Sequence, residues 1–356
     1  GYLPLQQHSL KEFLMAKITI RDIAKQSGVS TATVSRVLNN SPKVSPEVRS
    51  TILRVIEELG YHPSQAAREL KNKSSKTIAL VIADGTNEYY FQIAQAIIHA
   101  IQEEGYTLFI CNSFNNSEIE RNYLMMLSER KIDGLVLNSC GGNNELIVSL
   151  SQKIPTVLIH RRIDHPGFVG DFANADFGIS TYEMTMELIR NRHTKIGIIC
   201  GPTQFSSAAE RLQQFKRAIA SIHITVDRDY RYFLEGPHDS AFGYEALEQF
   251  LRLPHPPTAL VAAHNETCIG ALRYCRDHNI PIPETLSIVA PCNVNLCDLF
   301  YVQPTYALPD TWALGFRIGQ MLLERIQSEN QLLNREAIYI PRIIQGNSVS
   351  CPGDPR

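Results

Sequence analysis

Residues 18–40 read ITIRDIAKQSGVSTATVSRVLNN, and this stretch decides the fold of the first part of the chain. Thr19 is a typical helix N-cap residue, and an acidic capping partner follows it three positions later. Gly28 predicts the left-handed residue at which that helix ends, and Ser30 predicts the N-cap of a second helix over residues 31–38. Two short helices joined by a turn that contains glycine form a helix-turn-helix.

The predicted second helix has one apolar face and one polar face. A period of 3.6 residues places Val34, Val37 and Leu38 inward. The outward positions are Thr31, Ala32, Ser35 and Arg36. In DNA-binding helix-turn-helix motifs the second helix presents its N-terminal end to the major groove, so these four residues are candidates for contact with DNA. An ordinary helical hairpin has the same local pattern and is the alternative on this segment alone.

A third helix is predicted from Pro46 onward, with Ser45 as its N-cap. Its apolar stripe repeats at helical spacing and comprises Val48, Ile52, Val55, Ile56 and Leu59. Gly60 follows as the residue that ends the helix. Three helices around one small core form a self-sufficient headpiece, which we place at residues 15–60.

The charge of the chain is distributed unevenly. Residues 1–76 hold twelve Lys and Arg against six Asp and Glu, a net charge of +6, whereas the rest of the chain carries −8. A basic head on an acidic body indicates that only the head meets a polyanion. The length of 356 residues fits a small module joined to a larger α/β body, and the composition is typical of a soluble globular protein.

Residues 61–76 connect the head to the body and are interpreted as a hinge. Pro63 breaks the chain, and residues 64–71 predict a helix too short to be stable alone. Leu70 would be exposed on it, beside a face of small residues. This pattern is typical of a helix that folds on the minor groove of DNA and inserts an apolar side chain between base steps. A plain interdomain tether is the alternative.

From residue 77 to 347, strand-like apolar runs alternate with helical stretches, and the pattern restarts near residue 195. Such βαβ alternation predicts doubly wound parallel sheets with helices on both faces, in two successive halves. We expect an N-subdomain over about 77–173 plus 305–332, a C-subdomain over about 174–304 plus 333–347, and a tail over 348–356.

Doubly wound sheets bind ligands at the carboxyl ends of their strands, so residues at the predicted strand ends are candidates for an effector site. They are Tyr89, Tyr90, Phe91, Asn138, His160, Arg161, Asp171, Arg211, Phe242, Asn265 and Cys292. Aromatic rings with a few polar groups suit a sugar or a nucleoside. For any one of them a purely structural role is the alternative, and His160 in particular fits a histidine that is hydrogen-bonded within the protein.

Residues 17–71 resemble the headpiece and hinge of the LacI/GalR family of bacterial transcriptional regulators. The stretch quoted above, GYHPS at residues 60–64 and AARELK at residues 66–71 match the family in order and spacing, and the resemblance extends to about Asn347. It implies a cytoplasmic, homodimeric repressor of a pseudo-palindromic operator. It also implies a periplasmic-binding-protein-like body, in which a small-molecule effector binds in a cleft that closes by hinge motion.

The resemblance also implies roles for individual residues. Thr31, Ala32 and Arg36 would read bases, with phosphate or positioning contacts near Ser30, Thr33 and Ser35. Thr19 and Asn39 complete the DNA-binding set expected for the headpiece. In the hinge, Leu70 would enter the minor groove with Ala66, Ala67 and Lys71 nearby. In the body, Arg211 matches the family's ligand-contacting arginine.

Several expected acidic residues of the cleft are replaced in this chain. His160 precedes Arg161 where the family usually has aspartate, Asn265 stands for another aspartate, and Cys292 for a third. A carboxylate is the natural acceptor for sugar hydroxyls, whereas an amide is weaker and a thiol is poor. Either the effector is not an ordinary neutral sugar but an anion such as a sugar phosphate or acid, or the cleft is vestigial. A vestigial cleft would leave a constitutive regulator, or one that responds to a protein partner.

Other classes of protein are disfavoured by the sequence. It lacks a phosphate-binding glycine loop, a nucleophile elbow and metal-spaced His and Cys, so we expect no enzyme, cofactor or metal site. The eight scattered cysteines indicate a reducing compartment. An extracellular transport binding protein fits the body alone, but no signal peptide is recognisable. Met15 is interpreted as the natural start, which makes residues 1–14 an upstream segment without ordered structure.

Overall fold

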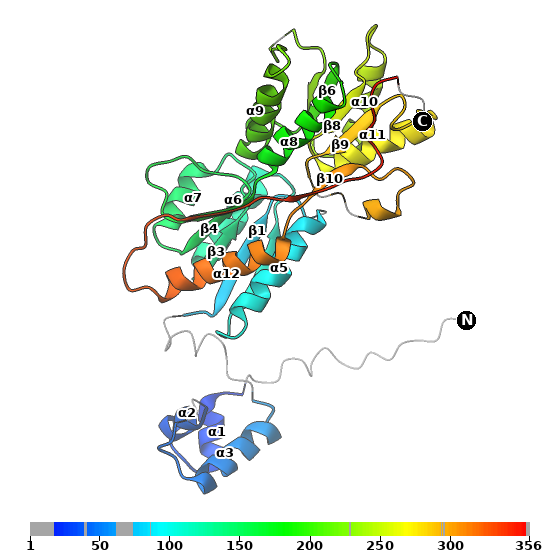
Figure 1. The fold of residues 1–356 in the computed structure, drawn as a ribbon. Coiled ribbons are helices and arrows are strands. Elements are labelled where there is room, and N and C mark those ends of the chain that lie inside the picture. Colours follow the sequence, from blue (N-terminus) through cyan, green and yellow to red (C-terminus); the bar gives the residue numbers. More distant parts are fainter. Residues whose placement is uncertain are drawn as a thin grey trace, which may run out of the picture. The chain divides into compact units, whose positions relative to one another are not determined.

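The computed structural model describes residues 18–38, 41–61, 74–85, 87–227, 229–292, 294 and 296–353. Contacts divide the chain into two compact units, residues 1–73 and 74–356 (Figure 1). The expected hinge helix, with Ala66, Ala67, Leu70 and Lys71, lies outside the described residues, as do Asn39 and residues 1–14. In the described part of the chain, no helix is both long and apolar enough to cross a membrane.

The head contains the three helices that the sequence predicts. They are α1 (Ile20–Ser27), α2 (Thr31–Leu38) and α3 (Pro46–Glu58). Their shared core comprises Ile23, Ala24, Val34, Val37, Ile52 and Val55. The helix-turn-helix and its third helix are therefore confirmed, and each apolar stripe faces the other two helices.

Local hydrogen bonds fix the ends of these helices. The carboxylate of Asp22 accepts from the backbone N–H of Thr19 at 2.8 Å and from its hydroxyl at 2.7 Å. Gly28 ends α1 with φ of 67°, a conformation that suits glycine because it has no Cβ. Ser45 accepts from the backbone N–H of Val48 at the start of α3. These predicted caps fix both ends of α1 and the start of α3.

The first sheet of the body has the strand order β11-β5-β4-β3-β1-β2 and is parallel throughout. Its strands are β1 (Thr77–Ile82), β2 (Thr107–Asn112), β3 (Gly134–Leu137), β4 (Thr156–Ile159), β5 (Asp171–Ala175) and β11 (Glu336–Tyr339). Its helices are α5 (Glu88–Ile101), α6 (Ser117–Glu129), α7 (Asn144–Ser151) and α12 (Thr311–Gln327). Ile78 and Leu80 of β1 pack with α5 and α12, whereas Ala79 and Val81 pack with α6 and α7. Both faces are thus buried, as is usual for a parallel sheet.

The second sheet has the order β12-β10-β9-β8-β6-β7, and only β12 is antiparallel to its neighbour. Its strands are β6 (Ile196–Cys200), β7 (Phe233–Glu235), β8 (Ala259–Ala262), β9 (Ser287–Ala290), β10 (Thr305–Leu308) and β12 (Arg342–Ile344). Its helices are α8 (Phe177–Arg190), α9 (Ser206–Ala220), α10 (Ser240–Leu251) and α11 (Asn265–Asp277). The prediction of two doubly wound α/β subdomains is confirmed.

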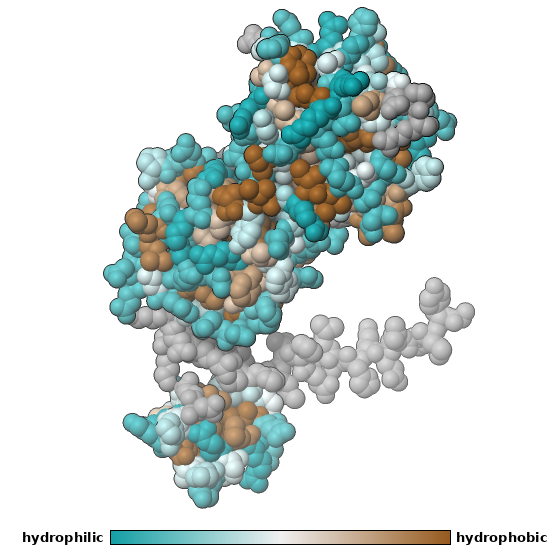
Figure 2. All heavy atoms as spheres, viewed as in Figure 1, coloured by the Kyte–Doolittle hydropathy of each residue, from teal (hydrophilic) through white to brown (hydrophobic). Residues whose placement is uncertain are grey.

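Three crossovers join the subdomains, and the expected boundaries at two of them were wrong. β10 pairs with β9 of the second sheet, although residues 305–308 were expected in the first subdomain. β11 pairs with β5 of the first sheet, although residues 336–339 were expected in the second. The chain therefore crosses after β5, after β10 and after β11. Figure 2 shows apolar atoms gathered across the middle of the body, along the segment that carries β11 and β12 in Figure 1.

The ends of the body also differ from expectation. Ser75 and Lys76, assigned above to the hinge, donate their backbone N–H groups to the Asp133 carboxylate and so belong to the body. The expected tail is partly built into the second subdomain. Ser348 donates its hydroxyl to the Ile288 carbonyl at 2.5 Å and is fully buried.

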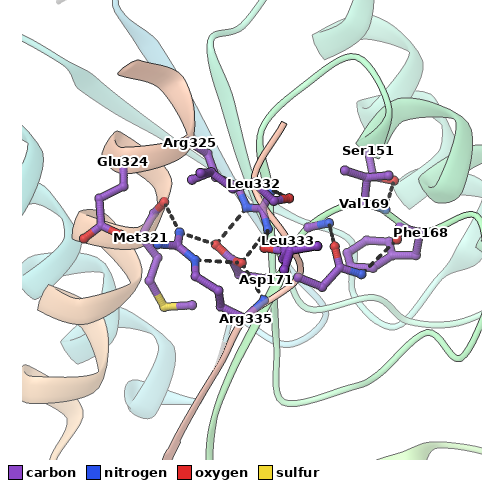
Figure 3. Close-up of polar contacts among 12 residues, drawn as sticks. Ser151, Phe168, Val169, Asp171, Met321, Glu324, Arg325, Leu332, Leu333 and Arg335 are labelled. Carbon is purple, nitrogen blue, oxygen red and sulfur yellow. Dashed lines mark hydrogen bonds and ion pairs between the residues drawn. The ribbon is translucent and has the colours of Figure 1, made fainter. Parts of the chain in front are cut away.

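A buried ion-pair cluster around Asp171 joins three elements of the first subdomain, β5, α12 and β11, each of which adjoins a crossover (Figure 3). Asp171 on β5 lies 2.6 Å from Nη2 of Arg325 on α12 and 2.7 Å from Nη2 of Arg335, which directly precedes β11. Burial alone raises the pKa of Asp171, but hydrogen bonds from the two arginines outweigh it and hold that pKa below its usual value. The cluster therefore fixes β5, α12 and β11 as one frame.

Replacing Asp171 with Asn should destabilise the body strongly, because it leaves the buried Arg325 without a counter-charge. We expect a loss of about 3–5 kcal/mol in the free energy of unfolding, measured by urea denaturation. Glu324→Gln is the matched control, since Glu324 is half-exposed where it pairs with Arg317 and Arg335. Its loss should stay within about 1 kcal/mol, and equal losses in both variants would contradict a central role for Asp171.

Candidate functional site

The carboxyl ends of strands from both sheets of the body surround one small cavity, called here the inner cavity. Its volume is about 40 Å³. Its lining comprises Ala83, Asp84, Asn87, Tyr89, Tyr90, Asn115, Asn138, His160, Arg161, Phe177, Ser207, Arg211, His238, His264, Asn265 and Cys292. A water molecule occupies about 30 Å³ in the liquid, so a metabolite enters only if the two subdomains separate.

Eight of the eleven candidate effector residues meet at this cavity. They are Tyr89, Tyr90, Asn138, His160, Arg161, Arg211, Asn265 and Cys292. The expectation that ligands bind at the carboxyl ends of the strands therefore identified residues that lie far apart in the sequence but close together in the structure. That they bind an effector stays a prediction.

The other three candidates do not line the inner cavity. Asp171 is the first residue of β5 and so lies at the amino end of the strand, where it forms the ion-pair cluster. Phe91 is 46% exposed, because the turn of α5 that buries Tyr89 and Tyr90 directs it outward. Phe242, in the first turn of α10, places its ring against Gly236.

Sequence reasoning missed half of the lining. Among the missed residues, His238 and His264 follow β7 and β8, and their rings stack with centroids 4.2 Å apart. Asp84 and Asn115 likewise follow β1 and β2. All four residues could have been found by examining the carboxyl end of every predicted strand. Phe177 and Ser207 could not, because they lie within the first turns of helices.

Two buried arginines line the inner cavity together with the carboxylate of Asp84. Arg211 is 5% exposed, lies with Cζ 5.1 Å from the centre of the Phe177 ring, and has no partner for Nε. Arg161 is 7% exposed and donates to the Ser139 carbonyl and to Asn115, but its Nε also lacks a partner. Among the described residues, neither guanidinium forms an ion pair with a carboxylate. Such buried cations are costly unless a counter-charge is supplied.

The histidines of the cavity are neutral near pH 7. Burial, and secondly Arg211, lower the pKa of His238 to about 4 and that of His160 well below its usual value. Burial likewise lowers the pKa of His264, followed by the neighbouring His238. Burial raises the pKa of the Cys292 thiol to about 12. The charged groups of the cavity are therefore the two arginines and the Asp84 carboxylate.

His160 is held in an unusual conformation at the edge of the cavity. Its φ is 66°, a left-handed value that is uncommon for residues with a side chain. Its Nδ1 lies 3.2 Å from Oδ1 of Asn174. The ring is thus fixed by the protein, as the structural alternative required, while it also lines the cavity.

In the head, α2 presents the polar face expected of a recognition helix. Thr31, Ala32 and Arg36 are exposed. The backbone N–H of Thr33 donates to Ser30 Oγ at 3.2 Å, so Ser30 caps the helix as predicted. Base reading by this face stays a prediction.

Comparison with known families decides the identity of both units. The family model "Periplasmic binding proteins and sugar binding domain of LacI family" matches residues 75–343. The model "Bacterial regulatory proteins, lacI family" matches residues 19–64. The chain belongs to the LacI family.

Similar proteins extend over nearly the whole chain. The HTH-type transcriptional repressor PurR of Proteus mirabilis (strain HI4320) is 32% identical over 340 residues, which cover 93% of this chain and 97% of PurR. PurR of Aliivibrio salmonicida (strain LFI1238) is 29% identical over 314 residues, covering 88% and 93% of the two chains. The lac repressor dimer bound to operator and the anti-inducer ONPF has a TM-score of 0.79 at 20% identity, covering 93% and 98%. The CelR–cellobiose complex has a TM-score of 0.68 at 22% identity, covering 93% and 100%.

This LacI-family protein is a DNA-binding transcriptional repressor with a ligand-binding domain, and it is not an enzyme. The predicted family, fold and class of function are thereby confirmed. His160, Asn265 and Cys292, the positions expected from the sequence to depart from the family pattern, all line the inner cavity. They therefore bear on the ligand of this LacI-family repressor, while its fold follows the family.

The lowered pKa of His238 predicts a loss of stability in acid. An unfolded histidine has a pKa of about 6.5, so the contribution of His238 is present above that value and is lost as the pH falls towards 4. Between about pH 7.5 and pH 5.5 we expect His238 to account for about 1 kcal/mol of the decrease in unfolding free energy. His238→Gln should flatten that decrease in chemical denaturation, whereas His255→Gln, at an exposed position, should not. Parallel profiles for the wild type and His238→Gln would show that the ring is not buried in neutral form.

Proposed function

We propose that this repressor binds a pseudo-palindromic operator as a homodimer in the cytoplasm, and that an anionic small molecule in the inner cavity modulates its affinity for DNA. The main support for a negatively charged effector is Arg211, a buried guanidinium without an ion-pair partner among the described residues. A negative group on the effector would supply the missing counter-charge.

The residues around Arg211 explain why an anion fits better than a neutral sugar. His160, Asn265 and Cys292 stand where the family usually has carboxylates, and none of them carries a negative charge here. A carboxylate at those positions could neutralise Arg211 and accept hydrogen bonds from sugar hydroxyls. Without them, the phosphate or carboxylate of a metabolite is the complementary partner.

The small inner cavity links binding to a change of shape. Residues from both subdomains line it, so an effector that enters has to separate them. A ligand shifts an equilibrium only by its differential affinity for the two arrangements. Reorientation of the subdomains would alter the dimer and hence the spacing of the two headpieces, which couples the effector to DNA.

The same small cavity also supports a second candidate, a vestigial cleft. In that case the regulator is constitutive or responds to a protein partner. The unbalanced charge of Arg211 favours the anionic effector, because nothing in a vestigial site requires a buried cation to be kept.

Dimeric DNA binding follows from the head, because one recognition helix reads only half of a site and a two-fold dimer reads a pseudo-palindrome. The lac repressor structure described above is a dimer bound to operator, and we extend that arrangement to this chain. Thr31, Ala32 and Arg36 would face the bases, with Ser30, Thr33, Ser35, Thr19 and Asn39 near phosphates. The hinge residues Ala66, Ala67, Leu70 and Lys71 would lie in the minor groove.

Selection from a random DNA library at fixed salt should enrich a palindrome. Arg36→Ala should relax the preference at one base pair of each half-site by about 1–3 kcal/mol, because a guanidinium binds guanine at two atoms. Leu70→Ala should remove the preference at the central step. Arg252→Ala makes the same change of charge at an exposed position on the body and should leave the motif intact. Salt-sensitive binding without an enriched motif would contradict operator recognition.

Arg211→Met should abolish the response to anionic effectors without destabilising the repressor. Replacing a buried charge by an apolar side chain of similar size is often neutral or stabilising by about 1–4 kcal/mol. Arg325→Met is the matched control, since it removes a buried arginine that pairs with Asp171 and should lose about 3 kcal/mol or more. Unfolding free energy and calorimetric titration with sugar phosphates and neutral sugars are the measurements. Equal destabilisation of both variants, or tight binding of neutral sugars only, would contradict the anionic effector.

A further inference from the structure

A second, larger cavity adjoins the inner cavity and shares Arg161 and Asn115 with it. We call it the outer cavity; its volume is about 490 Å³. We propose that the outer cavity is a subsite for an oxyanion group of the effector, so that the effector carries one anionic group at Arg211 and another in the outer cavity. This inference rests on the function proposed above and specifies the class of effector as an extended metabolite with two anionic groups.

The outer cavity is lined by two arginines. Arg161 and Arg162 line it, and no acidic residue does among those described. Arg162 is already paired with Glu336 and lies 3.8 Å from Glu210. Arg161 forms no such pair, and its buried Nε has no hydrogen-bond partner. Arg161 is thus the cation available to a ligand.

The carboxylate of Glu120, which acts electrostatically on Arg161, is hydrogen-bonded to other groups. Glu120 is fully buried and accepts from Ser139 Oγ at 3.2 Å, from the backbone N–H of Cys140 at 2.7 Å and from Asn143 Nδ2 at 2.9 Å. It holds the loop that follows β3, and Arg161 contacts the carbonyl of the same loop at Ser139. Glu120 therefore positions Arg161 and leaves its Nε unpartnered.

Two helix N-termini add to the attraction for an anion. Asn144, the first residue of α7, and Ser206, the first residue of α9, both line the outer cavity. Neither helix has a side-chain hydrogen bond at its N-cap, whereas Asn116 caps the neighbouring α6 with two. Free N–H groups and the helix dipole favour an oxyanion at such an end. Together with the buried arginine, they complete the donor set.

An anion in the outer cavity would touch both subdomains. Asn144 and Arg161 belong to the first subdomain, whereas Gln204 and Ser206 belong to the second. The two sides already meet there, since the backbone N–H of Arg162 donates to Ser206 Oγ at 2.9 Å and Cζ of Arg161 lies 3.8 Å from the centre of the Phe205 ring. A bound oxyanion would add a bridge at this contact and fix the separation of the subdomains.

Binding of inorganic phosphate to the full chain tests the subsite. The line width of phosphate in ³¹P NMR is followed during titration, with sodium chloride keeping the ionic strength constant so that screening is matched. Gln204→Glu should weaken phosphate binding about fivefold or more, because it places a negative charge in the outer cavity. Gln249→Glu makes the same substitution at an exposed position on α10 and should have no effect.

Asn144→Asp separates loss of binding from loss of folding. A carboxylate at the first residue of a helix stabilises it, so the melting temperature should stay the same or rise while phosphate binds more weakly. Phosphate binding that is absent in the wild type, or unchanged in both Gln204→Glu and Asn144→Asp, would overturn the subsite. Binding that survives both but is lost in Arg211→Met would also overturn it, by placing the anion in the inner cavity alone, and would leave the proposed function intact. Weakened phosphate binding together with no response of DNA affinity to any anionic metabolite would support the subsite and contradict the proposed effector.

Discussion

The ion pairs of Asp171 with Arg325 and Arg335 set the frame on which the body depends. These residues belong to β5, α12 and the segment before β11, and each of these elements is joined to the second subdomain by a crossover. A buried carboxylate is tolerated here because two guanidinium groups neutralise it and satisfy its oxygens. With the three elements fixed in one subdomain, relative movement of the subdomains is confined to the short connections after β5, before α12 and after β11.

The same requirement, that a charge removed from water needs a partner, is left unmet at the cleft. Arg211 and Arg161 are buried, although less completely than Asp171, and neither forms an ion pair with a carboxylate among the described residues. The nearby histidines respond by staying neutral, since burial and the arginines lower their pKa values. Asp171 is therefore a structural charge that Arg325 and Arg335 neutralise, whereas the counter-charge of Arg211 is proposed to come from the effector.

Much of this organisation was predictable from the sequence, for reasons that are local. Thr19, Gly28 and Ser45 determine helix ends through their own backbone and side-chain bonds, so the head followed directly. The apolar runs of β1, β3, β4 and β8 were equally clear because both faces of these strands are buried. The assignment of β10 and β11 to their sheets depends on which strands they pair with. The pairing of β11 with β5 joins residues more than a hundred positions apart, and no local sequence pattern encodes it. Asp171 was misplaced because the sequence does not show at which end of β5 it lies.

An anionic effector, as proposed above, would change what keeps the cleft shut. On the proposal of an anionic effector, closing the cleft without a ligand keeps Arg211 and Arg161 from solvent without an ion pair among the described residues, whereas opening it returns them to water. An anionic effector reverses that balance because it brings the counter-charge with it. The effector's charge, more than its shape, would therefore decide the relative orientation of the subdomains, and through the dimer the affinity for DNA.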